Sequence, residues 1–208
     1  MNASQETGSD TPIKTHIIWA HPRTDSLTAR VVSGLKAEAQ NNHMSVSELD
    51  LYRADFDPAL HEADEPDWKD PAKTFSPHVM HLAESLPGVD HLVIVFPVWW
   101  YSMPAMLKGY IDRVWNYGLV YGGGKKLPVS SIRWIALVGG ARGHFEKHQK
   151  HHYMEDLLNE GIAKYCGVEN SSVTFLYNTI ALEEDTDDLA KLHETLIDQA
   201  RSVVSALA

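Results

Sequence analysis

The sequence has little of what marks secreted, membrane-spanning or nucleic-acid-binding proteins. Its 208 residues include one cysteine, Cys166, which cannot form an internal disulfide and therefore fits a reducing cytoplasm. No apolar run approaches the roughly 20 residues needed to cross a membrane. The formal net charge of −10 argues against nucleic-acid partners, which require a basic surface. Any anionic cofactor must therefore be held by local donors rather than by the overall charge.

Several familiar motifs are also absent. The turn after the first expected strand lacks the Gly-x-Gly-x-x-Gly sequence of a Rossmann dinucleotide-binding half, which remains the alternative fold. The chain has no Gly-x-x-x-x-Gly-Lys-Ser/Thr phosphate loop and no Gly-x-Ser-x-Gly nucleophile elbow. Nucleoside-triphosphate hydrolysis and serine-hydrolase chemistry are therefore poorly supported. The polar residues 1–12 have no apolar segment of a signal peptide, and we expect them to form a flexible tail.

From residue 13 onwards, short apolar segments alternate with longer amphipathic ones. The expected strands cover residues 13–20, 45–51, 92–96, 133–138 and 172–180. The expected helices cover residues 26–40, 76–86, 103–117, 148–165 and 185–207, and residues 53–74 are expected to be mostly loop. This alternation predicts one α/β domain over residues 13–208, a three-layer sandwich around a five-stranded parallel sheet. The flavodoxin-like strand order 2-1-3-4-5 is the favoured topology.

The turn between the first strand and the first helix is rich in hydroxyl side chains. A helix N-terminus offers unpaired N–H groups and a positive dipole, which together bind phosphate without a net positive charge. His21, Thr24, Ser26 and Thr28 can add side-chain donors. Helix capping by Ser26 or Asp25 would explain one or two of these residues but not the whole cluster. The sequence therefore predicts a phosphate-binding loop.

An aromatic run joins the third expected strand to the next helix. Residues 92–96 are an unbroken apolar run, and Pro104 suits the first turn of the following helix. Trp99, Trp100 and Tyr101 lie between them, at the carboxyl end of a strand, where open parallel sheets bind ligands. Because successive side chains of an extended segment alternate, the three rings cannot all face one core. A ligand-binding aromatic turn is therefore favoured over three core aromatics.

Weaker signals follow the fourth strand and the aromatic helix. Gly139 and Gly140 would let the backbone approach a planar ligand, although an ordinary glycine turn explains them equally well. The glycine-rich residues 117–126 could form a wall of the site or a flexible connection. His148 and His152 share a helix face at a spacing that suits a metal, but a solvated face is favoured and no metal site is expected. One histidine among His144, His148, His151 and His152 could carry a proton near neutral pH.

The run from Phe96 to Gly109, FPVWWYSMPAMLKG, resembles the flavodoxin-like NAD(P)H:quinone oxidoreductases. This family includes DT-diaphorase, bacterial drug-activity modulators and ancillary subunits of potassium-efflux systems. The likeness extends to residues 20–22, 50–58, 118–122 and 139–140, and it covers most of the chain in the correct order. It implies a bound flavin, FMN or FAD, a homodimer with the site at the subunit interface, and two-electron transfer from NADH or NADPH to a quinone-like acceptor.

The resemblance also implies which residues form the site. Together with Thr24, the residues expected to hold the flavin are His21, Ser26, Leu27, Thr28, Pro97, Val98, Trp99, Trp100, Tyr101, Leu137, Val138, Gly139, Gly140 and Phe145. The residues expected to contribute to the substrate pocket are Leu119, Val120 and Tyr121.

One feature of the family is changed in this chain. Family members place a tyrosine and a histidine after the glycine pair to manage charge and a proton on the reduced ring. Counted without gaps, Phe145 takes the tyrosine position and has no hydroxyl, whereas His151 takes the histidine position. His152 or His148 could replace it if the loop differs in length. The expected catalytic residues are therefore His151 and His152.

These patterns favour an NAD(P)H dehydrogenase (quinone) located in the cytoplasm. The alternative is a regulatory subunit on a membrane transporter of the potassium-efflux type, with reductase activity as a secondary property. A one-electron flavodoxin carrier fits less well, because the bulky aromatic turn and a second substrate wall suit an enzyme that binds substrates.

Overall fold

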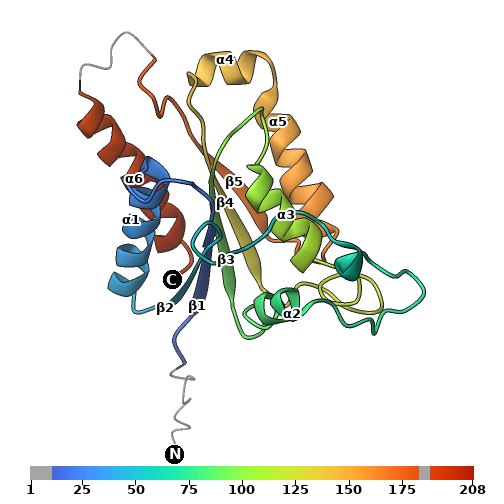
Figure 1. Ribbon diagram of the computed structural model, residues 1–208. Helices are drawn as coiled ribbons and strands as arrows, with labels where there is room; N and C mark the ends of the chain where they lie inside the picture. The colour runs from blue at the N-terminus through green and yellow to red at the C-terminus, as the bar shows by residue number, and fades with distance from the viewer. Residues whose placement is uncertain (1–10, 183–187) are drawn as a thin grey trace, which may run out of the picture.

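A computed structural model describes residues 11–182 and 188–208 of the protein. Its strands are β1 (Lys14–Trp19), β2 (Ser45–Asp50), β3 (His91–Pro97), β4 (Ser131–Leu137) and β5 (Ser171–Leu176). All neighbouring strands are parallel and their order is β2-β1-β3-β4-β5, which confirms the predicted topology (Figure 1). Residues 1–10 of the expected tail and residues 185–187 of the last expected helix lie outside the described residues.

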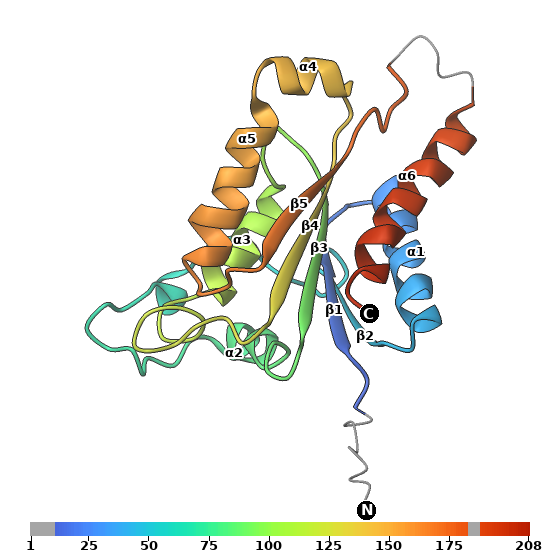
Figure 2. The same cartoon turned by 180° about the vertical axis from the view of Figure 1, so that it is seen from behind.

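Helices cover both faces of the sheet (Figures 1 and 2). On one face lie α1 (Leu27–Asn41) and α6 (Leu189–Ser205), which pack against each other. On the other face lie α2 (Pro77–Ala83), α3 (Ala105–Val114) and α5 (Lys150–Glu155), which the π-helical segment Asp156–Lys164 continues. The short α4 (Arg142–Lys147) lies beyond the carboxyl ends of the strands. No helix in residues 11–182 or 188–208 is long and apolar enough to span a membrane.

The central strands are buried on both faces because their side chains alternate between two apolar clusters. In β1, Ile17 and Trp19 face α1 and α6, whereas Ile18 faces α2 and α3. In β3, Val93 and Val95 belong to the first cluster, and the residues on either side belong to the second. This double burial explains why β3 reads as an unbroken apolar run in the sequence.

Several element boundaries differ from the prediction for local reasons. Pro104 is the N-cap of α3 and does not lie in its first turn. The helix ends at Val114 rather than at residue 117, because the Asn116 side chain accepts a hydrogen bond from the Tyr117 amide at 2.7 Å. The expected helix 148–165 begins earlier, as α4, and is interrupted where Gln149 adopts a left-handed φ of +53°. The expected strand 172–180 ends at Leu176.

The long connection between β2 and α2 is mostly loop, as predicted, with one 3₁₀ turn at Glu62–Asp64. A buried ion pair fastens it to α3, where Arg113 Nη2 lies 2.6 Å from Asp64 Oδ2. The same carboxylate accepts hydrogen bonds from the amide and the hydroxyl of Ser76 at 2.8 and 3.0 Å. Burial alone would raise the pKa of Asp64, but the hydrogen bonds from Ser76 and Arg113 outweigh it and hold that pKa below its usual value.

Candidate functional site

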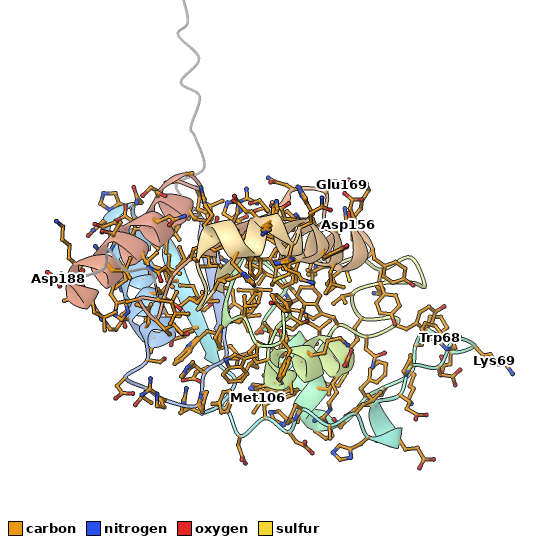
Figure 3. The ribbon with its side chains drawn as sticks, turned by 90° about the horizontal axis from the view of Figure 1, so that it is seen from above. Trp68, Lys69, Met106, Asp156, Glu169 and Asp188 are labelled. Carbon is orange, nitrogen blue, oxygen red and sulfur yellow. The ribbon has the colours of Figure 1, made fainter. Side chains whose placement is uncertain are left out.

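A cleft of about 620 Å³ opens at the carboxyl ends of β1, β3 and β4, where the sequence predicts a ligand crevice. Its lining residues are His21, Arg23, Asp25, Ser26, Leu27, Thr28, Arg30, Pro97, Val98, Trp99, Leu137, Gly139, Thr179, Ile180, Leu189 and His193. The expected phosphate loop, aromatic turn and glycine turn therefore meet in one place. Figure 3 views the molecule from the carboxyl ends of the strands. In this view Asp188 marks the start of α6 on one side of the molecule, and Trp68 lies on the other side.

The N-terminus of α1 supplies unpaired donors to the cleft. Ser26 is the N-cap, and its buried Oγ accepts a hydrogen bond from the Ala29 amide at 3.2 Å. The first two helical amides, those of Leu27 and Thr28, have no intrahelical partner, and no hydrogen bond joins them to another part of the described chain. The first turn holds no acidic residue. An anion would meet free N–H groups and the positive end of the helix dipole here. Thr24 is exposed and does not line the cleft.

His21 stands at the mouth of this loop in a defined orientation. Its Nδ1 accepts a hydrogen bond from the Arg23 amide at 3.1 Å. The Arg23 carbonyl lies farther from the same nitrogen, at 3.3 Å, so we assign the amide as the partner. Burial lowers the pKa of His21, and this outweighs hydrogen bonding with the Arg23 backbone, which raises it; the charges of Arg23 and Arg53 also lower it. With the Arg23 amide as the partner of Nδ1, the neutral ring carries its proton on Nε2, which can donate to a ligand.

The aromatic turn is a tight two-residue reversal. Trp99 and Ser102 exchange backbone hydrogen bonds of 3.0 and 3.1 Å around it. Trp100 and Tyr101 adopt φ values of +53° and +58°, a left-handed conformation that is unfavourable for bulky side chains. Trp99, Trp100 and Tyr101 are 41%, 96% and 46% exposed, which confirms that the three rings do not share one core. Backbone strain of this kind is concentrated at functional sites.

The glycine turn and Phe145 have different surroundings. A Cβ added at Gly140 would meet no atom within 4 Å, so protein packing does not require glycine there. Phe145 is buried, and its ring lies 5.7 Å from that of Tyr101 and 5.7 Å from that of Tyr177. Val138 is buried as well. Phe145 and Val138 belong to the apolar core and do not line the cleft.

The structure does not bring the two expected catalytic histidines into the cleft. His151 lies on α5, and its buried Nδ1 has no hydrogen-bond partner among the residues described. The ring of His152 lies against it, 3.9 Å between centroids, and points its Nδ1 toward Glu155 Oε2 at 3.4 Å. The neighbouring Lys150 ammonium lies 4.8 Å from the centre of the Tyr101 ring, which places the start of α5 beside the aromatic turn.

The expected substrate wall also lies elsewhere in a single chain. Leu119 and Val120 line a cavity of about 200 Å³ beside α2. Tyr121 lines another of about 310 Å³, with Trp68 and Tyr165 among its neighbours. These residues follow the end of α3 and precede β4, so they belong to the amino-terminal edge of the sheet, opposite α4 (Figure 1).

Sequence reasoning missed the part of the cleft that α6 and the interior of α1 supply. His193 of α6 donates from Nε2 to the Thr179 carbonyl at 3.1 Å, and its Nδ1 accepts from Arg30 Nη1 at 3.1 Å. This bridge joins α1, α6 and the segment after β5. Its residues are far apart in sequence and carry no motif, so only the position of that segment at the carboxyl edge of the sheet could have indicated them.

Comparison with known proteins extends the picture. The sequence profile of a family described as having a flavodoxin-like fold matches residues 13–200. An uncharacterized NAD(P)H oxidoreductase of Escherichia coli (strain K12), YcaK, is 47% identical over 193 residues, which span 92% of this chain and 97% of that protein. The ancillary protein KefF of a glutathione-regulated potassium-efflux system, from Enterobacter sp. (strain 638), is 31% identical over 106 residues, 50% of this chain and 60% of that protein.

Two solved structures show the same fold. An NAD(P)H:quinone oxidoreductase from Methanothermobacter marburgensis has a TM-score of 0.85 at 22% identity, over 95% of this chain and 98% of that chain. An FMN-dependent NADH-azoreductase from Bacillus anthracis str. Ames Ancestor, solved in complex with FMN, has a TM-score of 0.69 at 18% identity, over 94% of this chain and 99% of that chain.

Proposed function

The chain belongs to this family with the flavodoxin-like fold, and from that premise we propose that it is a flavin-dependent NAD(P)H:quinone oxidoreductase, an NAD(P)H dehydrogenase (quinone). The names of the Escherichia coli relative and of the Methanothermobacter structure support an NAD(P)H-linked reductase. When bound, the flavin supplies two-electron transfer from NADH or NADPH to a quinone-like acceptor.

One observation carries the proposal: a single cleft combines an anion-binding end with a flat apolar end. The free amides of Leu27 and Thr28 form the first end. Val98, Trp99 and Gly139 form the second, within the same lining. A flavin has the same division, because an apolar three-ring system is linked to a phosphate. The residues present therefore fit the cofactor.

The chain's own groups divide the work of binding and orientation. Leu27, Thr28 and the Nε2 proton of His21 would hold the phosphate region. The backbone at Val98 and Gly139 would lie along the ring system. Because the Val98 amide already donates to the Leu137 carbonyl at 2.8 Å, the Gly139 amide is the N–H group that would stabilise developing negative charge there. His151, which lies on α5 outside the cleft of the single chain and has an unpartnered Nδ1, stays the proposed proton carrier, and in that role it would have to reach the ring system.

The choice between FMN and FAD is part of the proposal. The Bacillus anthracis structure was solved with FMN, which supports that cofactor. The lining also includes Leu189 and His193, beyond the loop and the two turns that would hold FMN, so FAD stays the alternative cofactor.

An anaerobic absorbance titration tests the function. Purified protein, loaded with FMN or FAD if necessary, should show flavin bands that bleach on addition of NADH or NADPH and return on addition of a quinone. Chromatography of the released cofactor identifies it. Protein that binds neither flavin would refute the proposal, as would loaded protein that oxidises neither nucleotide with any quinone.

We also propose a homodimer in the cytoplasm. The nearly complete exposure of Trp100 and the distance of Tyr121 from the cleft support two chains that complete each other's sites. Sedimentation velocity at assay concentrations should show a dimer. A fully active monomer would contradict this part of the proposal.

A regulatory role on a membrane transporter is the second candidate, and the partial likeness to KefF favours it. If the protein has this role, deletion of its gene should slow glutathione-controlled potassium efflux from cells. Unchanged efflux, together with fast quinone turnover by the purified protein, would leave only the reductase.

A further inference from the structure

Arg53 is bound to the backbone of the phosphate loop, although it does not line the cleft. It follows β2, and each nitrogen of its guanidinium has one acceptor. Nη2 donates to the His21 carbonyl at 2.7 Å, and Nη1 donates to the Pro22 carbonyl at 2.9 Å. Nε donates to Asp50 Oδ2 at 2.6 Å. The planar fork therefore fixes two successive peptide groups at once.

Holding these carbonyls determines where the next amide points. In a trans peptide the C=O and the following N–H point in opposite directions. With the Pro22 carbonyl turned toward Arg53, the Arg23 amide is turned away from it, and it donates to His21 Nδ1 at 3.1 Å. That bond leaves the His21 proton on Nε2. A chain of contacts thus runs from Arg53 to the donor on His21.

The guanidinium itself is held rigidly. Asp50 Oδ1 accepts from the amides of Tyr52 and Arg53 at 3.0 and 3.3 Å, while Oδ2 takes the side chain. The rings of Trp19 and Tyr52 lie 5.1 and 5.6 Å from the guanidinium carbon. Because Asp50 neutralises the charge locally, the guanidinium contributes mainly geometry to the loop.

We propose that Arg53 is a positioning residue for the flavin phosphate: by fixing the His21 and Pro22 carbonyls and, through them, the Arg23 amide, it turns the His21 Nε2 proton toward the anion. This inference rests on the proposed function, since it needs a flavin in the cleft. The inference differs from the proposed function because it predicts a loss of affinity that is specific to flavins carrying a phosphate.

The test compares FMN with riboflavin, which has the same ring and no phosphate. Dissociation constants are measured by quenching of flavin fluorescence on the flavin-free full chain. Arg53→Gln should weaken FMN binding about tenfold to a hundredfold and leave riboflavin binding nearly unchanged. Arg53→Lys should show a similar loss, because one ammonium cannot reproduce the fork.

Arg201→Gln is the matched control. Arg201 forms an i,i+3 ion pair with Asp198 at 2.7 Å on α6, as Arg53 does with Asp50, but it has no contact with the loop. The Arg201→Gln variant should bind FMN and riboflavin as the unsubstituted protein does. Circular dichroism should show that all variants are folded.

Three results would overturn the role of Arg53: unchanged FMN binding in Arg53→Gln, an equal loss of FMN and riboflavin, or full recovery in Arg53→Lys. If the unsubstituted protein binds neither FMN, FAD nor riboflavin, the proposed function fails as well. Normal binding by the unsubstituted protein with no effect of Arg53→Gln refutes only the positioning role.

Discussion

Replacement of Trp100 by glycine should stabilise the flavin-free monomer, although it removes one of the large side chains of the aromatic turn. Trp100 has a φ of +53°, and such a conformation costs a bulky residue about 1–3 kcal/mol. Glycine adopts it freely but loses about 0.5–1 kcal/mol through the greater entropy of the unfolded chain. The ring is 96% exposed, so almost no apolar burial is lost. The free energy of unfolding should therefore rise by about 0–2.5 kcal/mol.

Equilibrium urea unfolding of Trp100→Gly measures this change, and Trp68→Gly is the contrasting variant. Trp68 has no left-handed φ, and its ring lies 5.1 Å from that of Tyr117, so glycine there should destabilise the protein. The measurements are made at protein concentrations low enough for sedimentation velocity to show a monomer, because the proposed dimer would cover the ring. A loss of more than about 1 kcal/mol in monomeric Trp100→Gly would refute the reasoning, because it would mean that the ring is buried within its own chain.

The functional consequence of the same variant has the opposite sign. If the strained turn presents Trp100 to the flavin or the acceptor, Trp100→Gly should raise the flavin dissociation constant or the KM of the quinone while the protein becomes more stable. Gain of stability with loss of binding is the signature of strain maintained for function. Unchanged binding and turnover would remove the functional role of this side chain.

Other predictions concern the buried groups and the charges around the cleft. Asp64→Ala should lower the free energy of unfolding by about 3–5 kcal/mol, because it leaves Arg113 buried without its ion-pair partner. Loss of the exposed Asp112–Lys108 ion pair should lower the free energy of unfolding by about 1 kcal/mol or less. Equal losses would contradict the argument. The pKa of Asp64 in the folded protein lies below its unfolded value of about 3.9. Its contribution to stability is therefore present above that value and is lost as the pH falls through the folded pKa. In acid, the difference in unfolding free energy between Asp64→Ala and the unsubstituted protein should become smaller. Phe145→Ala should cost about 3–5 kcal/mol in urea unfolding, and a near-neutral result would show that its ring is not part of the core. Added KCl should change the FMN dissociation constant only slightly; a steep loss of affinity would show that cationic side chains, rather than neutral donors, hold the phosphate.

The strand order was predictable because it depends on patterns that the sequence carries locally. Alternation of apolar strands and amphipathic helices defines a doubly wound sheet, and a strand buried on both faces has no polar residues to alternate with. Ser26 and Asp25 were both candidate N-caps from their residue types, and the structure shows that Ser26 is the N-cap of α1. The meeting of three loops in one cleft follows from the same topology, since parallel strands end at one edge.

The remaining features depend on tertiary contacts that leave no local signal. The left-handed conformation of Trp100 and Tyr101 was hidden, because glycine or asparagine usually marks such turns. The burial of Phe145 is decided by rings from the aromatic turn and from the segment after β5. The contacts of Arg53 join residues more than 30 positions apart. The place of Leu119, Val120 and Tyr121 in the working site still depends on a second chain, so it stays a prediction.

The charges around the cleft determine how a chain with a net charge of −10 would hold the proposed anionic cofactor. Each arginine near the phosphate loop has a carboxylate within reach: Arg23 has Asp25 at 3.9 Å, Arg30 has Glu194 at 2.7 Å, and Arg53 has Asp50 at 2.6 Å. The arginines therefore offset nearby acidic groups and leave little net positive charge for the ligand. Attraction must then come from oriented neutral donors, namely the first amides of α1 and the Nε2 proton of His21. Because such donors act at short range and in fixed directions, the geometry of the loop determines affinity more than the number of its charges, and a guanidinium that only orients the backbone can be as important as one that touches the phosphate.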